Sequence, residues 1–313
     1  MKKITFTLLL LTTIGFISCR KTGNDPNITQ YDETNIQNYI KANGLTAMKR
    51  DTTDGDTSGI YYQILSQGST AGTPLDYSDT VKFVFTLKSF DGKYNSIDSL
   101  TNNHYDGFLG HINQNGLPKG LQLAMHNLIK YKGTRARVLI PSRLAYGVNG
   151  NGSGSSSNVN TRIAGNQCLD YYVNVVSDLN TYDDQVIKKY MATNSLTGFV
   201  KAAGGYYYKV SVPGTGINPI AEYSAFTATY TGTFLNGTQF DNTYATTATS
   251  FDLSGNGGSS YISGVTQGLQ GYTTGAAVTL LLPSRYGYGR SGTTGIASNV
   301  NLRFDYTIVT VTN

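Results

Sequence analysis

The stretch Ile-Pro-Ser-Arg-Leu-Ala-Tyr-Gly at residues 140–147 returns almost unchanged as Leu-Pro-Ser-Arg-Tyr-Gly-Tyr-Gly at residues 282–289. An apolar run that ends in Pro-Ser-Arg, an aromatic residue and glycine is typical of a strand that leads into a turn. A phrase of this length that occurs twice in one chain indicates the duplication of a larger unit. We therefore expect the sequence around both copies to repeat as well.

The repeat extends in both directions from this phrase. Residues 31–45 and 182–196 both begin with Tyr-Asp and continue with apolar residues spaced as on one face of a helix. They predict a short leading helix for each copy, with Asp32 and Asp183 as N-caps. Further matches are Gly-Leu-Gln at residues 120–122 with 268–270, Ile163 with Ile296, and Leu169 with Leu302. The sequence thus predicts a tandem duplication.

Both copies predict the same order of elements. A leading helix and an aromatic strand are followed by an alternating strand, which ends in Asp-Gly or Asn-Gly. A short helix comes next, expected at about residues 266–272 in the second copy, and then the strand into the Pro-Ser-Arg turn and a closing strand. The predicted fold class is α+β, with two domains at residues 31–180 and 181–313. Each domain is an antiparallel β-sheet wrapped on a short α-helix.

Residues 1–18 have the form of a signal peptide. Lys2 and Lys3 precede an apolar run that is too short to span a membrane, and Phe16-Ile17-Ser18-Cys19 closes it. This ending resembles a bacterial lipobox, although Phe16 stands where leucine is usual. The resemblance implies cleavage before Cys19 and lipidation of its thiol, with residues 19–30 as a polar tether. An ordinary signal peptide with an incidental cysteine is the alternative.

A lipidated Cys19 predicts a protein of the cell envelope that is held on a membrane by its anchor. Arg20 is not the aspartate that is associated with retention at the inner membrane of enteric bacteria. The expected location is therefore the outer membrane, facing the periplasm.

Composition excludes several classes of function. The formal net charge is +5 without any basic run, which argues against nucleic acid as a partner because phosphate contacts need clustered Lys and Arg. His104, His111 and His126 are not at metal-ligand spacing, and we expect all three at the surface. No metal and no cofactor are predicted.

Taken in order, the motifs of the second copy resemble the FKBP family of peptidyl-prolyl isomerases. They are Tyr230-Thr231-Gly232, Asn236–Asp241, Gly268–Gln270, Leu282–Gly289 and Leu302–Asp305. The first copy matches through Asp91-Gly92, Gly120–Gln122, Ile140–Gly147 and Leu169–Tyr171. The ordered set is specific, whereas any single piece would be weak.

The resemblance implies an apolar, aromatic cleft in which an X–Pro amide rotates. In the second copy, Asp241 and Tyr288 are its polar members, and Tyr288 is the expected hydroxyl donor to a substrate carbonyl. Asp241 would orient the hydrogen bonding of the cleft. The floor carries Val265 where the family usually has tryptophan, which leaves it roomier. The other lining residues are Tyr230, Phe240, Ile262, Ile296 and Phe304.

The first copy departs further from the family pattern. The Phe-Asp pair becomes Asn95-Ser96 or, with a one-residue gap, Tyr94-Asn95, so the acidic member is missing in either alignment. Leu117 is matched to the floor tryptophan. The weaker binding site predicted for this copy comprises Phe85, Leu117, Tyr146, Ile163 and Tyr171.

Two functions remain open. The first is an FKBP-type isomerase that acts on proline-containing exported polypeptides and assists their folding, with the second copy as the more active one. The alternative is a non-catalytic polypeptide-binding module or chaperone with degenerate clefts.

Overall fold

The computed structural model describes residues 27–55, 57–96, 104–155, 157–158, 160–243, 247–254 and 261–312. The predicted signal peptide, Cys19 and most of the tether lie outside the described residues. Within the described ranges, no helix is both long enough and apolar enough to span a membrane.

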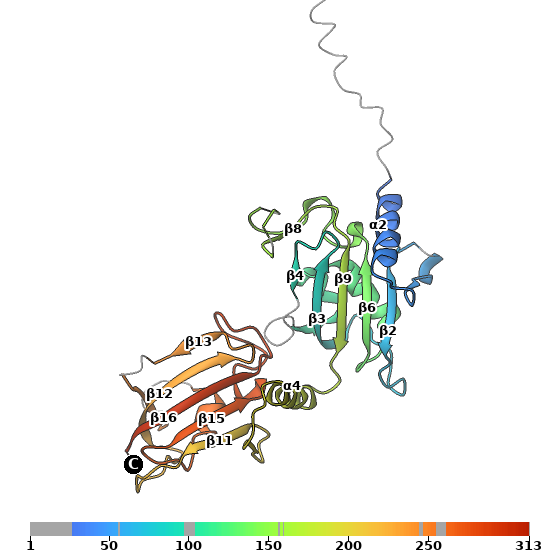
Figure 1. The fold of residues 1–313 in the computed structure, drawn as a ribbon. Coiled ribbons are helices and arrows are strands. Elements are labelled where there is room, and N and C mark those ends of the chain that lie inside the picture. The colour runs from blue at the N-terminus through green and yellow to red at the C-terminus, as the bar shows by residue number, and fades with distance from the viewer. Residues whose placement is uncertain are drawn as a thin grey trace, which may run out of the picture.

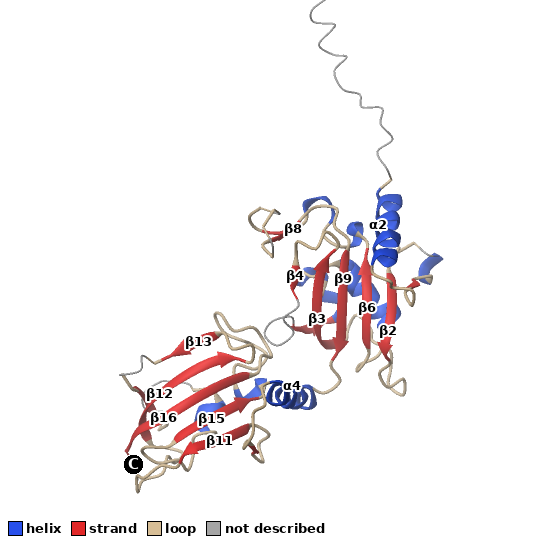
Figure 2. Cartoon of the chain, viewed as in Figure 1, coloured by secondary structure: helices blue, strands red, loops and turns tan. Residues whose placement is uncertain are grey.

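In the described part of the chain, each half forms a seven-stranded antiparallel sheet accompanied by few helices (Figures 1 and 2). The first half contains α2 (Ile28–Ala42), β1 (Lys49–Arg50), β2 (Tyr61–Ser66), β3 (Thr80–Ser89), β4 (Asn95–Ser96), β5 (His104–Phe108), α3 (Lys119–Ala124), a π-helical turn η4 (Met125–Ile129), β6 (Arg135–Ile140), β7 (Asn151–Gly152), β8 (Arg162–Ile163) and β9 (Leu169–Val175), with short 3-10 turns at Thr53–Gly55, Leu109–His111, Asn113–Asn115, Ser142–Leu144 and Gly147–Asn149. The second half contains α4 (Leu179–Thr193), β10 (Val200–Lys201), β11 (Tyr207–Val212), β12 (Ala225–Phe234), β13 (Gln239–Asn242), β14 (Thr249–Asp252), α5 (Ser263–Thr266), β15 (Ala277–Leu282), the 3-10 turn η7 (Ser284–Tyr286) and β16 (Leu302–Thr312). The predicted α+β class is confirmed.

The two sheets have the same topology. The first runs β1-β2-β6-β9-β3-β4 with β5 paired to β3, and the second runs β10-β11-β15-β16-β12-β13 with β14 paired to β12. Each strand of the first sheet therefore has a counterpart in the second sheet at the same place. Helix α4 lies between the two sheets in Figure 1.

Alternating side chains place the core on one face of each central strand. Val81 and Phe83 on β3 are buried, and Phe226 and Ala228 on β12 hold the same positions in the second sheet. Because strand side chains alternate between faces, the opposite face carries the polar neighbours. Each short helix packs on the buried face, where Leu121 of α3 is fully buried.

The leading helices form as predicted, but Asp32 and Asp183 are not their N-cap residues. Asn27 Oδ1 accepts from the Thr29 amide at 3.0 Å, and Asp178 Oδ2 accepts from the Thr181 amide at 2.8 Å. Asp32 and Asp183 lie inside the helices, one turn before the buried Ile36 and Ile187. Since residues four apart share a helix face, both carboxylates point into the protein.

The Pro-Ser-Arg turns are the partners of these buried carboxylates. The Ser142 hydroxyl donates to Asp32 Oδ1 at 2.6 Å, and the Ser284 hydroxyl donates to Asp183 Oδ2 at 2.7 Å. The adjacent arginine extends the attachment, since Arg143 donates to the carbonyls of Thr57 and Ser58 at 2.7 Å each. The phrase that occurs twice in the sequence thus docks the leading helix in both domains.

The short helix of the second domain begins earlier than predicted, at Ser263 instead of about residue 266. Two glycines identify the correct correspondence between the domains. A Cβ on Gly120 would lie 2.4 Å from the Ile140 Cγ2 methyl, and a Cβ on Gly264 would lie 2.2 Å from Leu282 Cδ1. Ile140 and Leu282 open the repeated phrase, so Gly120 corresponds to Gly264 and not to Gly268. The match of residues 120–122 with 268–270 was wrong.

Candidate functional site

One end of the second domain gathers all eight residues predicted for its cleft. Tyr230 comes from β12, Phe240 and Asp241 from β13, and Phe304 from β16. Val265 lies on α5, and Ile262 is the N-cap residue of this helix. The partly buried Tyr230, Phe240, Ile262 and Tyr288 pack against the buried Val265, Ile296 and Phe304. Their catalytic and binding roles stay a prediction.

The aromatic wall of this cleft is built from rings in edge contact. The Phe240 and Phe304 centroids lie 5.6 Å apart at an interplanar angle of 84°, a T-shaped arrangement. Tyr230 lies against Phe304 at 6.1 Å. The wall is therefore apolar and continuous across β12, β13 and β16.

Gly232 makes room for this wall. A Cβ at that position would lie 2.8 Å from Cε2 and Cζ of Phe240 and 2.9 Å from Cε1 of Phe304. Those distances are far below van der Waals contact, so a larger residue would displace one of the two rings. The glycine in Tyr-Thr-Gly is thus required by the packing of the cleft.

Three side chains of the predicted cleft carry polar groups: Tyr230, Asp241 and Tyr288. The Tyr230 hydroxyl donates to Asp241 Oδ2 at 2.7 Å. Burial and the negative charge of Asp241 raise the pKa of Tyr288, so its phenol stays protonated at neutral pH. Within the described part of the chain, the Tyr288 hydroxyl donates no hydrogen bond to another residue. It is therefore available to a ligand carbonyl.

The matching site in the first domain is filled by Leu87. Leu87 on β3 pairs with Tyr171 and Ser96, as Gly232 on β12 pairs with Phe304 and Asp241. A buried leucine side chain therefore stands in the first domain where, in the second domain, a glycine makes room for the Phe240 and Phe304 rings. The pairing also places Ser96 at the position of Asp241, which selects the ungapped alignment over the one with Tyr94-Asn95.

The tyrosine hydroxyl that has no partner among the described residues of the second domain is hydrogen-bonded in the first domain. The Tyr146 hydroxyl, at the position of Tyr288, donates to the Gly116 carbonyl at 3.1 Å. Tyr171 is fully buried against Phe85, with ring centroids 5.6 Å apart, and Ile163 is buried beside them. The five residues predicted for this site all belong to the first core cluster.

Leu117 is not the counterpart of Val265. Because Gly120 corresponds to Gly264, the residue after it, Leu121, takes the place of Val265 on the floor of the first domain. Leu117 precedes the helix and is only partly buried. The signal for the right alignment was Pro118 before α3, which stands where Ile262 precedes α5.

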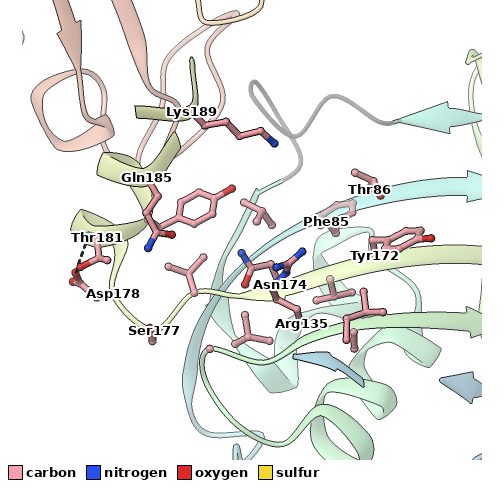
Figure 3. A pocket seen from close by; sticks show the side chains of 18 residues that line it. Phe85, Thr86, Arg135, Tyr172, Asn174, Ser177, Asp178, Thr181, Gln185 and Lys189 are labelled. Atoms are coloured by element: carbon pink, nitrogen blue, oxygen red, sulfur yellow. Dashed lines mark hydrogen bonds between the residues drawn. The ribbon is translucent and has the colours of Figure 1, made fainter. Parts of the chain in front are cut away.

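A hollow of about 460 Å³ lies between the outer face of the first sheet and α4, and Phe85 of the site predicted in the first domain is among its lining residues (Figure 3). Arg135 and Asn174 line it from the sheet, and Gln185 and Lys189 line it from the helix. Amide, basic and aromatic side chains are mixed here without a convergent set of polar groups. We assign no function to this hollow.

Residues 219–309 match the family described as FKBP-type peptidyl-prolyl cis-trans isomerase. FkpA of Escherichia coli is 32% identical over 115 residues, which cover 36% of this chain and 40% of that protein. FkpA of Buchnera aphidicola (Baizongia pistaciae) is 27% identical over 146 residues, covering 42% of this chain and 56% of that protein. The chain thus spans between two fifths and three fifths of the length of these relatives.

Two solved structures are similar to part of the chain. The crystal structure of FkpA from Escherichia coli is 28% identical, with a TM-score of 0.36, and covers 42% of this chain and 59% of that one. A peptidyl-prolyl cis-trans isomerase from Pseudomonas syringae is 29% identical, also with a TM-score of 0.36, and covers 43% of this chain and 96% of that one. The residues that match the FKBP-type family description, 219–309, contain all eight residues predicted for the cleft.

Proposed function

We propose that this chain is a peptidyl-prolyl cis-trans isomerase, in a tandem form whose second domain carries the working cleft. The observation that carries the proposal is the hydroxyl of Tyr288, which donates to no residue in the described part of the chain and lies beside an apolar wall made by Tyr230, Phe240 and Phe304. The match of residues 219–309 to the FKBP-type family supports it.

The reaction needs no proton transfer and no nucleophile. Rotation about an X–Pro amide has a barrier of about 18–20 kcal/mol because conjugation is lost as the amide twists. The twisted carbonyl is less polar than the planar one. An apolar wall that offers less hydrogen bonding than water therefore favours the twisted state over the ground state, which is differential binding of the transition state.

Tyr288 and Asp241 supply the remaining polar interactions. The Tyr288 hydroxyl can donate to the rotating carbonyl, as a donor already positioned beside the apolar wall. Asp241 accepts from Tyr230 and thereby holds the Tyr230 ring against Phe304. Asp241 acts here by orientation and is not required as an acid.

The first domain binds polypeptide without efficient turnover. Leu87 stands where Gly232 makes room for the Phe240 and Phe304 rings, and the Tyr146 hydroxyl is already bonded to Gly116. These two observations favour the second candidate function, a polypeptide-holding module, for this domain alone.

The clients are exported polypeptides that contain proline. This part of the proposal rests on the lipobox-like sequence before Cys19, which would anchor the mature protein by a lipid to the outer membrane, facing the periplasm. Metabolic labelling with a fatty acid analogue tests the anchor, since Cys19→Ala must abolish the label.

The isomerase proposal is tested with a chain that begins at residue 20 and a Phe-Pro peptide, read by NMR exchange without a coupling protease. Tyr288→Phe should lower kcat/KM about tenfold, as expected for one lost transition-state hydrogen bond of about 1.4 kcal/mol. Tyr146→Phe, the same change at the matching position of the first domain, is the control and should have little effect. If the folded wild-type protein is inactive, the proposal fails and the holding module becomes the function of both domains.

A further inference from the structure

A carboxylate of the first domain reaches the cleft edge of the second. Asp106 lies on β5, and its side chain is only 2% exposed. Asp106 Oδ1 lies 3.1 Å from Nε of Arg290, and Asp106 Oδ2 accepts from Nδ2 of Asn299 at 3.2 Å. Lys82 on the neighbouring strand lies 3.5 Å from the same Oδ2. Asp106 therefore binds two residues of the second domain at once.

Arg290 and Asn299 stand at the two ends of one loop, residues 289–299, which we call the lip loop. The Asn299 amide donates to the Gly289 carbonyl at 2.8 Å and closes the base of this loop. Tyr288 immediately precedes the lip loop, and its carbonyl accepts from the Gly292 amide at 3.1 Å. Ile296, the buried lining residue, lies within it. Two of the eight cleft residues are thus positioned by the segment that Asp106 holds.

The backbone conformation of the lip loop occurs in both domains, whereas its attachment to Asp106 occurs only in the second. Asn166 in the first domain has a φ of 56° and bonds to Gly147, as Asn299 has a φ of 58° and bonds to Gly289. The position of Arg290, however, is taken in the first domain by Val148, which is 75% exposed. The attachment therefore distinguishes the second cleft from the first.

The surroundings of Asp106 favour a strong attachment. A buried carboxylate is costly unless it is paired, and here Arg290 and Lys82 supply opposite charges while Asn299 donates a hydrogen bond to Oδ2. Among the described residues, Oδ1 is held by its ion pair with Arg290 and accepts no hydrogen bond. The other titratable groups on this face are His104 on β5 and Tyr182 on α4, whose rings meet edge to face at 6.3 Å. Burial lowers the pKa of His104 to about 4, so it adds no charge beside Asp106 at neutral pH.

We propose that Asp106 is a positioning residue for the cleft of the second domain, which it controls by holding both ends of the lip loop. The inference rests on the proposed isomerase function. It gives the first domain a role in catalysis even though its own cleft is filled, because docking of that domain orders Tyr288 and Ile296 for the substrate.

The test uses the full processed chain with Asp106→Asn, Arg290→Gln and the double variant. Asp106→Asn should raise KM about fivefold with little change in kcat, since it loosens the peptide-binding edge and not the apolar wall. The double variant should be no worse than the more severe single variant, because both changes remove one interaction. Independent, additive effects would overturn the proposal.

Asp170→Asn is the matched control. Asp170 is also a buried, ion-paired carboxylate of the first sheet, 2.6 Å from Arg137, but it binds within its own domain. It should destabilise the first domain and leave KM unchanged. A rise in KM equal to that of Asp106→Asn would show a general loss of stability and overturn the positioning role.

Hydrogen exchange of the lip-loop amides separates this proposal from the isomerase proposal. The Asn299 and Gly292 amides should exchange faster in Asp106→Asn than in wild type and Asp170→Asn, whether or not the protein is an isomerase. Unchanged exchange of these amides would refute the attachment itself. An inactive wild type with faster exchange in the variant would keep the attachment and reject only its role in catalysis.

Discussion

Gly232→Ala is the change that probes the cleft most directly. Gly232 lies in the middle of β12 with an ordinary strand conformation, so alanine is compatible with its backbone. Reduced freedom of the unfolded chain should by itself stabilise the variant by about 0.4–1 kcal/mol. The added Cβ, however, would lie within 2.9 Å of both Phe240 and Phe304, and overpacking of this kind costs about 1–3 kcal/mol.

The expected net effect is a loss of about 1–2 kcal/mol in the stability of the second domain, because the clash exceeds the backbone gain. Phe240 is the ring that moves, since it is only partly buried, while Phe304 is held inside the core. Displacement of Phe240 removes the apolar wall at β13, and kcat/KM should fall about tenfold. Chemical unfolding followed by the NMR signals of second-domain amides and protease-free isomerisation by NMR measure the two effects.

Leu87→Ala is the reciprocal variant in the first domain. It opens a cavity and should destabilise that domain by about 2–5 kcal/mol without raising its isomerase activity to that of the second domain, since Ser96 still replaces Asp241. Full kcat/KM in a folded Gly232→Ala protein would refute the reasoning. It would mean that the two rings can move without loss of the cleft.

Two pH effects follow from the buried groups. Burial raises the pKa of the Asp183 carboxyl in the folded protein. Its contribution to the docking of α4 is therefore present at low pH and is lost as the pH rises through the folded pKa. Asp183→Asn should flatten this pH dependence of thermal unfolding between pH 3 and 7. Burial lowers the pKa of His104 to about 4, so docking of the domains is fully stable above pH 6.5 and weakens as pH falls toward 4. His104→Gln should remove that loss in small-angle scattering, and an unchanged pH profile would contradict the burial of His104.

Much of the fold could be predicted from the sequence because its strands alternate and its turns carry Asp-Gly and Asn-Gly. The leading helices were found for the same reason, from apolar periodicity. Their caps were assigned wrongly, since the partners of Asp32 and Asp183 lie more than a hundred residues away, at Ser142 and Ser284. The local sequence shows that a short polar residue is present. It does not show whether its hydrogen-bond partner is a backbone amide of the same helix or a residue far away in the chain.

The errors in the site have a similar cause. The alignment relied on the identical tripeptide Gly-Leu-Gln instead of the position at which the helix begins. It therefore matched Leu117, and not Leu121, with Val265. His104 was expected at the surface, but it packs against Tyr182 of the other domain. Contacts between domains, including Asp106 with Arg290, leave no periodic pattern in either segment. They become visible only when the two domains are docked.

The repeated phrase itself says less about activity than its resemblance suggests. Its serine and arginine both contact the leading helix in each domain, so folding alone is sufficient to retain them. The positions at which the two predicted clefts differ lie elsewhere, at Gly232 against Leu87 and at Asp241 against Ser96. Even the tyrosine of the phrase depends on its surroundings, since Tyr146 is bonded to a carbonyl while Tyr288 donates to none of the residues that the structure describes. The activity of a tandem chain of this kind should therefore be inferred from the residues at the positions of Gly232 and Asp241, on β12 and β13, and not from the repeated phrase.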